Sequence, residues 1–126
     1  MLNDQNTPIE PSNLLPFSHF RRLGSLLFVS GQASVDSSGK IVPDSFDGEM
    51  RRSIMNLEAV LLSAGSDLRH VIQTRNYVRC PDDLGLFNAL SAEYFRKPYP
   101  ARTTLTNCLP ETLKYEIDCI AVIPTS

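Results

Sequence analysis

The sequence predicts an α+β domain in which two helices cover one face of a single β-sheet. Two segments show the apolar spacing of amphipathic helices, and five others are rich in β-branched, aromatic or alternating apolar residues. Their order is two strands, a helix, a strand, a helix and two strands. At 126 residues the chain has the length of one domain, so we expect residues 1–126 to fold as a single unit.

The chain begins with residues 1–16, which hold three prolines among mostly polar side chains. Because proline has no N–H to donate to a strand ladder, we expect an extended arm here. Two short strands are then predicted over residues 17–22 and 26–30, around a turn that contains a glycine. The second strand is continuously apolar from Leu26 to Val29, which predicts that both of its faces are covered.

The first helix gives the clearest pattern in the sequence. Asp44 or Ser45 can cap its N-terminus, and Gly65 can end it in the left-handed conformation that glycine adopts easily. Its apolar face consists of residues spaced four, three and four positions apart, namely Met50, Ile54, Leu57 and Leu61. Such a stripe is typical of core packing, so we assign it to the core.

A strand over residues 71–79 and a second helix over residues 84–95 follow. The strand segment is rich in β-branched and aromatic residues, which favour a pleated and partly buried surface. The helix brings Phe87, Leu90 and Tyr94 to one side. We expect that side to face the sheet.

The last two strands, over residues 101–107 and 113–123, are predicted to form a hairpin because a short loop joins them. In the final strand, alternating residues should meet the helices, namely Leu113, Tyr115, Ile117, Cys119 and Ala121. Either register that we consider for this hairpin puts Arg102 on the same face of the sheet as Glu116. This arrangement fits a solvated ion pair and also fits a binding site, and the pattern leaves both interpretations open.

Composition excludes several classes of protein and site. The net charge of −2 gives no general attraction for nucleic acid, so no nucleic-acid partner is expected. No run reaches the roughly 18 apolar residues of a membrane span, and the N-terminus lacks a signal-peptide pattern. Cys80, Cys108 and Cys119 include no C-x-x-C pair, so neither a disulfide framework nor a metal site is predicted. We therefore expect a cytoplasmic protein with no membrane partner.

A sheet with helices on one side leaves its other face open. Ile120 and Val122 belong to that open face in the predicted final strand, and exposed apolar area of this kind marks an interaction surface. If copies of the chain cover it, Arg102 and Glu116 lie at or near a subunit interface. There an arginine can hold a carboxylate with two hydrogen bonds, and a carboxylate can orient a water molecule.

Five segments, in order along the chain, resemble the Rid family of reactive-intermediate deaminases, also called YjgF or endoribonuclease L-PSP. They are LLFVSGQ (26–32), NLEAVLLSAG (56–65), FN and SAEYF within 87–95, PARTT (100–104), and LP and YEIDCIAV within 109–122. The similarity runs from about Phe17 to Val122, and the combination of SGQ, PARTT and EIDCIA is specific to this family.

The resemblance implies a chorismate-mutase-like α+β fold assembled as a homotrimer, with active sites in clefts between subunits. It also implies a reaction. Members with an arginine in the PAR motif hydrolyse 2-imino or enamine acids derived from amino acids to a 2-oxo acid and ammonia. They use no cofactor, and their partner is a small imino or enamine carboxylate.

The resemblance assigns roles to individual residues. Arg102 matches the arginine that binds the substrate carboxylate, and Glu116 matches the carboxylate associated with the hydrolytic water. Four residues match positions that line the cleft, namely Ser30, Gly31, Asn88 and Thr104, the last standing where many members carry cysteine. Phe17 is a fifth substrate-binding candidate and stands where many members carry tyrosine. His19 is a possible further site residue, since the 2-aminomuconate deaminase branch has a histidine there.

Three alternatives remain beside the imine deaminase. The first is a 2-aminomuconate-type deaminase, which the match at His19 favours. The second is a module that binds a small carboxylate at Arg102 without turnover. The third is an endoribonuclease or translation inhibitor, which the family's other name suggests. The acidic balance of the chain and the lack of an aromatic and basic RNA-binding motif count against it.

Overall fold

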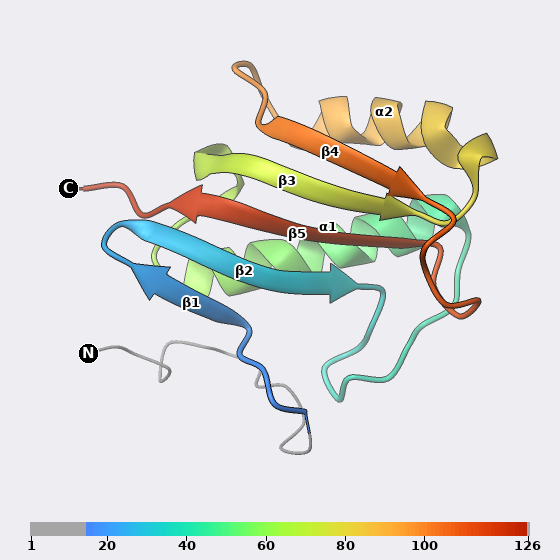
Figure 1. Cartoon of the computed structure of the whole chain (residues 1–126), viewed down its shortest axis with the longest axis horizontal. Coiled ribbons are helices and arrows are strands. Elements are labelled where there is room, and N and C mark those ends of the chain that lie inside the picture. The colour runs from blue at the N-terminus through green and yellow to red at the C-terminus, as the bar shows by residue number, and fades with distance from the viewer. Residues whose placement is uncertain (1–14, 126) are drawn as a thin grey trace.

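The computed structural model of the chain describes residues 15–125, so nearly all of the expected arm over 1–16 lies outside the described residues. The sheet contains the strands β1 (Phe20–Leu23), β2 (Leu26–Ala33), β3 (Val71–Val78), β4 (Ala101–Thr106) and β5 (Tyr115–Val122). The helices are α1 (Phe46–Ser63), α2 (Leu84–Tyr94) and the short 3-10 helices η2 (Leu68–His70) and η3 (Pro81–Asp83). In Figure 1, α1 lies behind the sheet and α2 lies along its β4 edge, and both helices contact the buried Tyr115 of β5. The predicted α+β architecture is thus confirmed.

The order of strands in the sheet is β1-β2-β5-β3-β4, and only β3 and β4 run parallel. The predicted hairpin of residues 101–107 with 113–123 is therefore wrong. Helix α2 carries the chain back so that β4 joins the sheet beside β3, in the same direction. The loop after β4 then takes the chain past the end of β3, and β5 enters between β3 and β2 (Figure 1). A short loop between two strands did not make them neighbours.

The core fills the space between the sheet and the helices. The predicted apolar face of α1 is confirmed, since Met50, Ile54, Leu57 and Leu61 are all fully buried. The alternation of β5 is confirmed as well, because every second residue from Tyr115 to Ala121 is buried. The ring of Tyr115 contacts Phe46 of α1 and Phe87 of α2, with centroid separations of 5.8 and 6.0 Å. These contacts attach both helices to the central strand.

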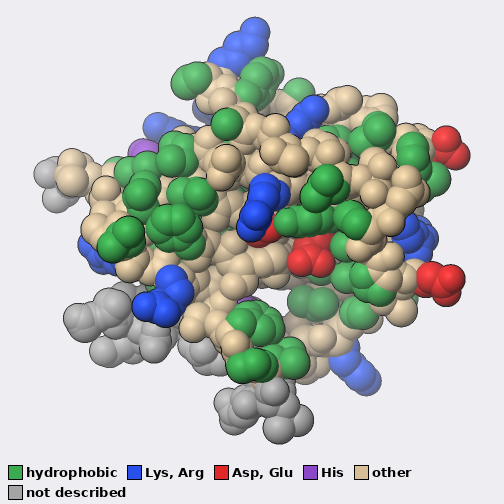
Figure 2. Space-filling view, in the orientation of Figure 1, with side chains coloured by type: hydrophobic (Ala, Val, Ile, Leu, Met, Phe, Trp, Pro, Cys, Tyr) green, Lys and Arg blue, Asp and Glu red, His purple; other side chains and the backbone are tan. Residues whose placement is uncertain are grey.

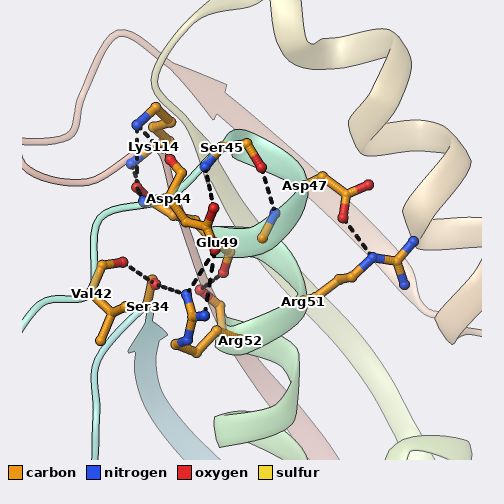
Figure 3. A network of polar contacts seen from close by, with 11 residues as sticks. Ser34, Val42, Asp44, Ser45, Asp47, Glu49, Arg51, Arg52 and Lys114 are labelled. Carbon is orange, nitrogen blue, oxygen red and sulfur yellow. Dashed lines mark hydrogen bonds and ion pairs between the residues drawn. The ribbon is translucent and has the colours of Figure 1, made fainter.

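A buried polar cluster fixes the start of α1 against the start of β5 (Figure 3). Ser45 caps the helix as predicted, because its side chain accepts a hydrogen bond from the N–H of Gly48 at 3.2 Å. The carboxylate of the buried Glu49 accepts from the N–H groups of Lys114 and Asp44, at 2.9 and 3.2 Å. The cluster therefore holds the chain two residues before Glu116.

No helix within residues 15–125 lies over the open face of the sheet. Leu27 and Val29 of β2 are buried on the helix side, but Phe28 between them is 42% exposed. The prediction that both faces of this strand are covered is thus wrong for a single chain. Leu105 of β4 is also exposed on this face, and Figure 2 shows hydrophobic side chains spread over it. Within residues 15–125 no helix is long and apolar enough to cross a membrane.

Candidate active site

A cavity of about 330 Å³ opens on the uncovered face of the sheet, around Glu116 of β5. Its wall on the β2 side includes Ser30 and Gly31, and Phe17 of the segment before β1 also lines it. The pairing of β2 with β5 is irregular between Val29 and Gln32, so the backbone of β2 bulges at this point. The strand does not end there and continues to Ala33. The structure therefore brings together four of the predicted site residues, including Glu116.

The position of Gly31 explains why a glycine occurs in the bulge. A Cβ atom built on Gly31 would overlap the carboxylate of Glu116. The missing side chain thus leaves the space that the carboxylate occupies. Next to it, the hydroxyl of Ser30 donates to the carbonyl of Ser18 at 2.6 Å, and the N–H of Ser30 donates to the carbonyl of His19 at 2.9 Å. These bonds join the segment before β1 to the bulge.

The surroundings of Glu116 change its affinity for a proton. Burial raises the pKa of the Glu116 carboxyl above its usual range, and the negative charge of Asp118 raises it further. Asp118 is itself held in place, accepting from Nε of Arg75 at 2.9 Å and from the hydroxyl of Tyr77 at 2.8 Å. Burial and this bond to Asp118 raise the pKa of Tyr77. A carboxyl group with a raised pKa is suited to accept and return a proton during a reaction.

Arg102 lies elsewhere, beside a second cavity of about 200 Å³ between α2 and strands β3 and β4. Nη1 of Arg102 donates to Oδ1 of Asn88 at 2.9 Å, and the guanidinium carbon lies 4.9 Å from the centre of the Phe87 ring. A guanidinium has five N–H donors, and Asn88 is its only recorded hydrogen-bond partner within residues 15–125. The rest of the fork can receive a carboxylate.

Thr104 lies two residues after Arg102 on the same face of β4, beside Asn76 of β3. Its hydroxyl oxygen is buried and has no hydrogen-bond partner among the residues that the structure describes. A buried hydroxyl without a partner is unfavourable. The three predicted residues Asn88, Arg102 and Thr104 thus lie on the same side of the sheet and form a second group.

The two groups lie on opposite faces of the sheet. Arg102 pairs with Thr74, and Thr74 pairs with Cys119, whose side chain is buried on the helix side. Glu116 pairs with Tyr77, on the open side. Because paired residues point to the same face, the expectation that one face of a single chain carries both Arg102 and Glu116 is wrong. We call Phe17, Ser30, Gly31 and Glu116 the Glu116 group, and Asn88, Arg102 and Thr104 the Arg102 group.

Sequence reasoning missed Arg75 and Tyr77 as neighbours of the Glu116 group. Their alternation within β3 does place them on one face, but only the pairing of β3 with β5 brings them to Asp118. The possible site residue His19 is half-buried and contributes its carbonyl to Ser30. Nδ1 of His70, just before β3, lies 2.7 Å from Oδ1 of Asp67. Over residues 15–125, no three His, Cys, Asp or Glu side chains are arranged to hold a metal ion.

Comparison with known proteins agrees with this architecture. The family model described as Endoribonuclease L-PSP matches residues 7–123. A Mus musculus protein named 2-iminobutanoate/2-iminopropanoate deaminase is 31% identical over 119 residues, covering 93% of this chain and 88% of that protein. A RutC family protein of Pyrococcus horikoshii is 33% identical over 113 residues, covering 88% and 90%.

A solved structure gives the same result. The crystal structure of the YjgF gene product from E. coli superposes with a TM-score of 0.77 at 27% identity, covering 91% of this chain and 94% of that one. The resemblance seen in the sequence is therefore confirmed. The chain belongs to the endoribonuclease L-PSP family, which is also the Rid or YjgF family.

Proposed function

We propose that this protein is a cofactor-independent hydrolytic deaminase of small 2-imino acids and the enamines that interconvert with them. The observation that carries the proposal is the pair of groups in two cavities. One presents a guanidinium with free donors, and the other presents a carboxyl group of raised pKa. Together they supply a binding site for a carboxylate and a group that can move protons. The name of the Mus musculus relative, a deaminase of 2-iminobutanoate and 2-iminopropanoate, supports the same reaction class.

The proposal requires that copies of the chain share each active site. Arg102 and Glu116 of one chain point to opposite faces of the sheet, so one small substrate cannot touch both. β4 is an edge strand, and the exposed Phe28 and Leu105 leave apolar area on the open face. We propose a homotrimer in which the Arg102 group of one subunit meets the Glu116 group of the next, which covers part of this apolar area.

In the proposed reaction, Arg102 binds the substrate carboxylate and so fixes the position of the imine carbon. Glu116 accepts a proton from a water molecule as its oxygen bonds to that carbon. Passing this proton to the nitrogen gives a carbinolamine, whose hydroxyl proton then also moves to the nitrogen through Glu116. The C=O bond forms as the carbon–nitrogen bond breaks, and ammonia leaves. The balance is one imino acid and one water giving one 2-oxo acid and one ammonia. Holding water and imine together supplies much of the rate increase, since imines already react with water.

The direct test generates an imine in the assay from an amino acid and an amino-acid oxidase. We expect the purified protein to raise the rate of ammonia and 2-oxo acid release, and Arg102→Ala to remove the increase. Arg102→Lys is the matched control, because it keeps the charge and loses the fork. Hydrolysis at the uncatalysed rate together with saturable binding of 2-oxo acids would show a binding module instead. An Arg102→Ala variant as fast as the wild type would refute the assignment.

A further inference from the structure

The cavity beside Arg102 continues inward between α2 and the sheet. Its walls are largely apolar and are formed by Ala92, Phe95, Tyr99 and Pro100. Thr74 and Asn76 of β3 also line it, and each is only 3% exposed. The cavity has a volume of about 200 Å³, which is room for a short side chain rather than a large ring system. Among the residues that the structure describes, Arg102 is the only charged one that lines it.

A chain of hydrogen bonds runs through the polar residues of this cavity. The hydroxyl of Tyr115 donates to Oδ1 of Asn76 at 2.6 Å. Nδ2 of Asn76 then donates to the hydroxyl oxygen of Thr74 at 3.0 Å. Since that oxygen accepts, the hydrogen of the Thr74 hydroxyl is available to donate, and it has no recorded acceptor within residues 15–125. This series of hydrogen bonds therefore ends at the Thr74 hydroxyl, which can donate a hydrogen bond into the cavity.

Polar side chains are unusual at the positions of Thr74 and Asn76, as their neighbours in the sheet show. Thr74 and Asn76 pair with Cys119 and Ile117, both buried in the apolar core. Apolar side chains would fill the same places without the need for polar partners, and a buried donor left without an acceptor is unfavourable. An acceptor from a ligand would satisfy the Thr74 hydroxyl.

We propose that this cavity binds the side chain of the ligand whose carboxylate lies on Arg102, and that Thr74 donates a hydrogen bond to an uncharged oxygen in that side chain. The apolar walls favour a short hydrocarbon stem before the oxygen. A second carboxylate is disfavoured, because with Arg102 engaged it would be buried without an opposite charge. The identity of the ligand as a 2-imino acid rests on the proposed function, whereas the selectivity rests on the cavity.

Stable 2-oxo acids test the inference by calorimetric titration of the purified full-length protein. 5-Methoxy-2-oxopentanoate and 2-oxoheptanoate differ only in an ether oxygen replaced by a methylene group. We expect the ether to bind roughly fivefold to tenfold more tightly, as one buried hydrogen bond provides. Thr74→Val should abolish the difference, and Thr74→Ser, which keeps the hydroxyl, should restore it. Equal binding of the two acids by the wild type would overturn the inference.

A second variant tests the cavity without touching its hydrogen bonds. Ala92→Leu fills part of the space from an exposed position of helix α2. We expect it to weaken binding of 5-methoxy-2-oxopentanoate far more than binding of pyruvate, whose side chain is a methyl group. Ala89→Leu is the matched control, since Ala89 is exposed on the same helix and does not line the cavity. Equal effects of Ala92→Leu on both acids would also overturn the inference, and this decides the matter if Thr74→Val fails to fold.

Failure of the inference and failure of the proposed function give different results. Hydrolysis of an alanine-derived imine without any preference for the ether would refute the cavity assignment and leave the deaminase intact. A preference for the ether that depends on Thr74, without any hydrolysis, would refute the deaminase and support the cavity. No binding of any of the three 2-oxo acids would contradict the cavity assignment.

Discussion

The Glu116 group and the Arg102 group occupy contrasting parts of one sheet. Glu116 belongs to β5, a central strand that is paired on both sides, and its carboxylate rests against the backbone bulge at Gly31. Arg102 belongs to β4, an edge strand that is paired only with β3, and its side chain is exposed beside α2. The central position buries Glu116, the proton-transfer group that we propose, and raises its pKa, while the edge position leaves the charged Arg102 open to a ligand.

This contrast supports separate roles for the two groups, a division of work in which the Glu116 group transfers protons and the Arg102 group binds the substrate. A carboxyl group gains a raised pKa by burial, and a central strand provides that burial. An arginine that binds a small anion instead needs free donors, and the edge of a sheet leaves them accessible. Substitutions in the two groups should therefore change different kinetic quantities.

The largest effect is expected for Glu116→Gln. Loss of the proton acceptor should lower kcat by about 10²–10⁴-fold, while binding of 2-oxo acids stays within a few-fold because Arg102 lies in the other group. Steady-state kinetics and calorimetric titration measure the two effects separately. If Glu116→Gln raised KM and left kcat unchanged, the division of work would be wrong.

Gly31→Ala is expected to have the next largest effect. The new Cβ would overlap the Glu116 carboxylate and push it out of place, so we expect kcat to fall by about tenfold or more, since positioning controls such rates. Gly85→Ala is the control, because a Cβ on that glycine of α2 meets nothing within 4 Å. Equal activity of Gly31→Ala and Gly85→Ala would show that the position of Glu116 does not matter.

The raised pKa of Glu116 predicts how stability depends on pH. The native carboxyl keeps its proton above the ordinary value of 4.5, where the unfolded chain has already lost it. The native state then binds more protons, so this group lowers stability as pH rises through that window. Glu116→Gln should therefore melt at a higher temperature than the wild type near neutral pH, and the difference should shrink toward pH 4.

The same property predicts the pH profile of the reaction. The active carboxylate form should be lost as pH falls through the raised pKa, which sets the acid limb of kcat. Asp118→Asn removes a negative neighbour and should move that limb to lower pH. If the acid limb did not move in Asp118→Asn, Asp118 would not be a cause of the raised pKa of Glu116. If the melting temperatures of Glu116→Gln and the wild type differed by the same amount at every pH, the pKa of Glu116 would not be raised in the native state.

The smallest effect is expected at Thr104 in the Arg102 group. Its buried hydroxyl has no partner among residues 15–125, so Thr104→Val should leave the free energy of unfolding unchanged or raise it by about 1 kcal/mol. If the hydroxyl also binds the ligand, its loss in Thr104→Val should raise KM a few-fold. Thr104→Ser, which keeps the hydroxyl, should then restore the wild-type KM. Clear destabilisation by Thr104→Val, measured by denaturant unfolding, would mean that the hydroxyl has a stabilising partner.

Local features of the fold could be predicted from the sequence, but the order of the strands could not. Ser45 caps α1 and Gly65 ends it with a φ of 89°, as the sequence indicates, because caps and turns depend on neighbouring residues. Strand pairing depends instead on the path of the chain through space. Alternation within a strand tells which residues share a face and not which strand lies beside it.

The position of the Arg102 group could not be predicted for a related reason. In β5 the buried residues fix which side faces the core. In β4 the residues are exposed or half-buried on both faces, so no apolar pattern identifies the helix side. Thr74 and Asn76 belong to a segment whose sequence is that of an ordinary strand, so the sequence does not mark them as site residues. Only the structure shows that both line the cavity beside Arg102.

The central claim, that one chain supplies Arg102 and another supplies Glu116, is tested most directly by mixing two inactive variants. Arg102→Ala and Glu116→Gln, carrying different tags, are coexpressed, and oligomers with both tags are purified and weighed by native mass spectrometry. In a mixed trimer, whichever variant is present twice, one of the three shared sites would pair an intact Arg102 with an intact Glu116, which is about a third of the sites. We expect imine hydrolysis to recover to about that fraction of the wild-type rate. Mixed oligomers as inactive as either variant alone would contradict the account.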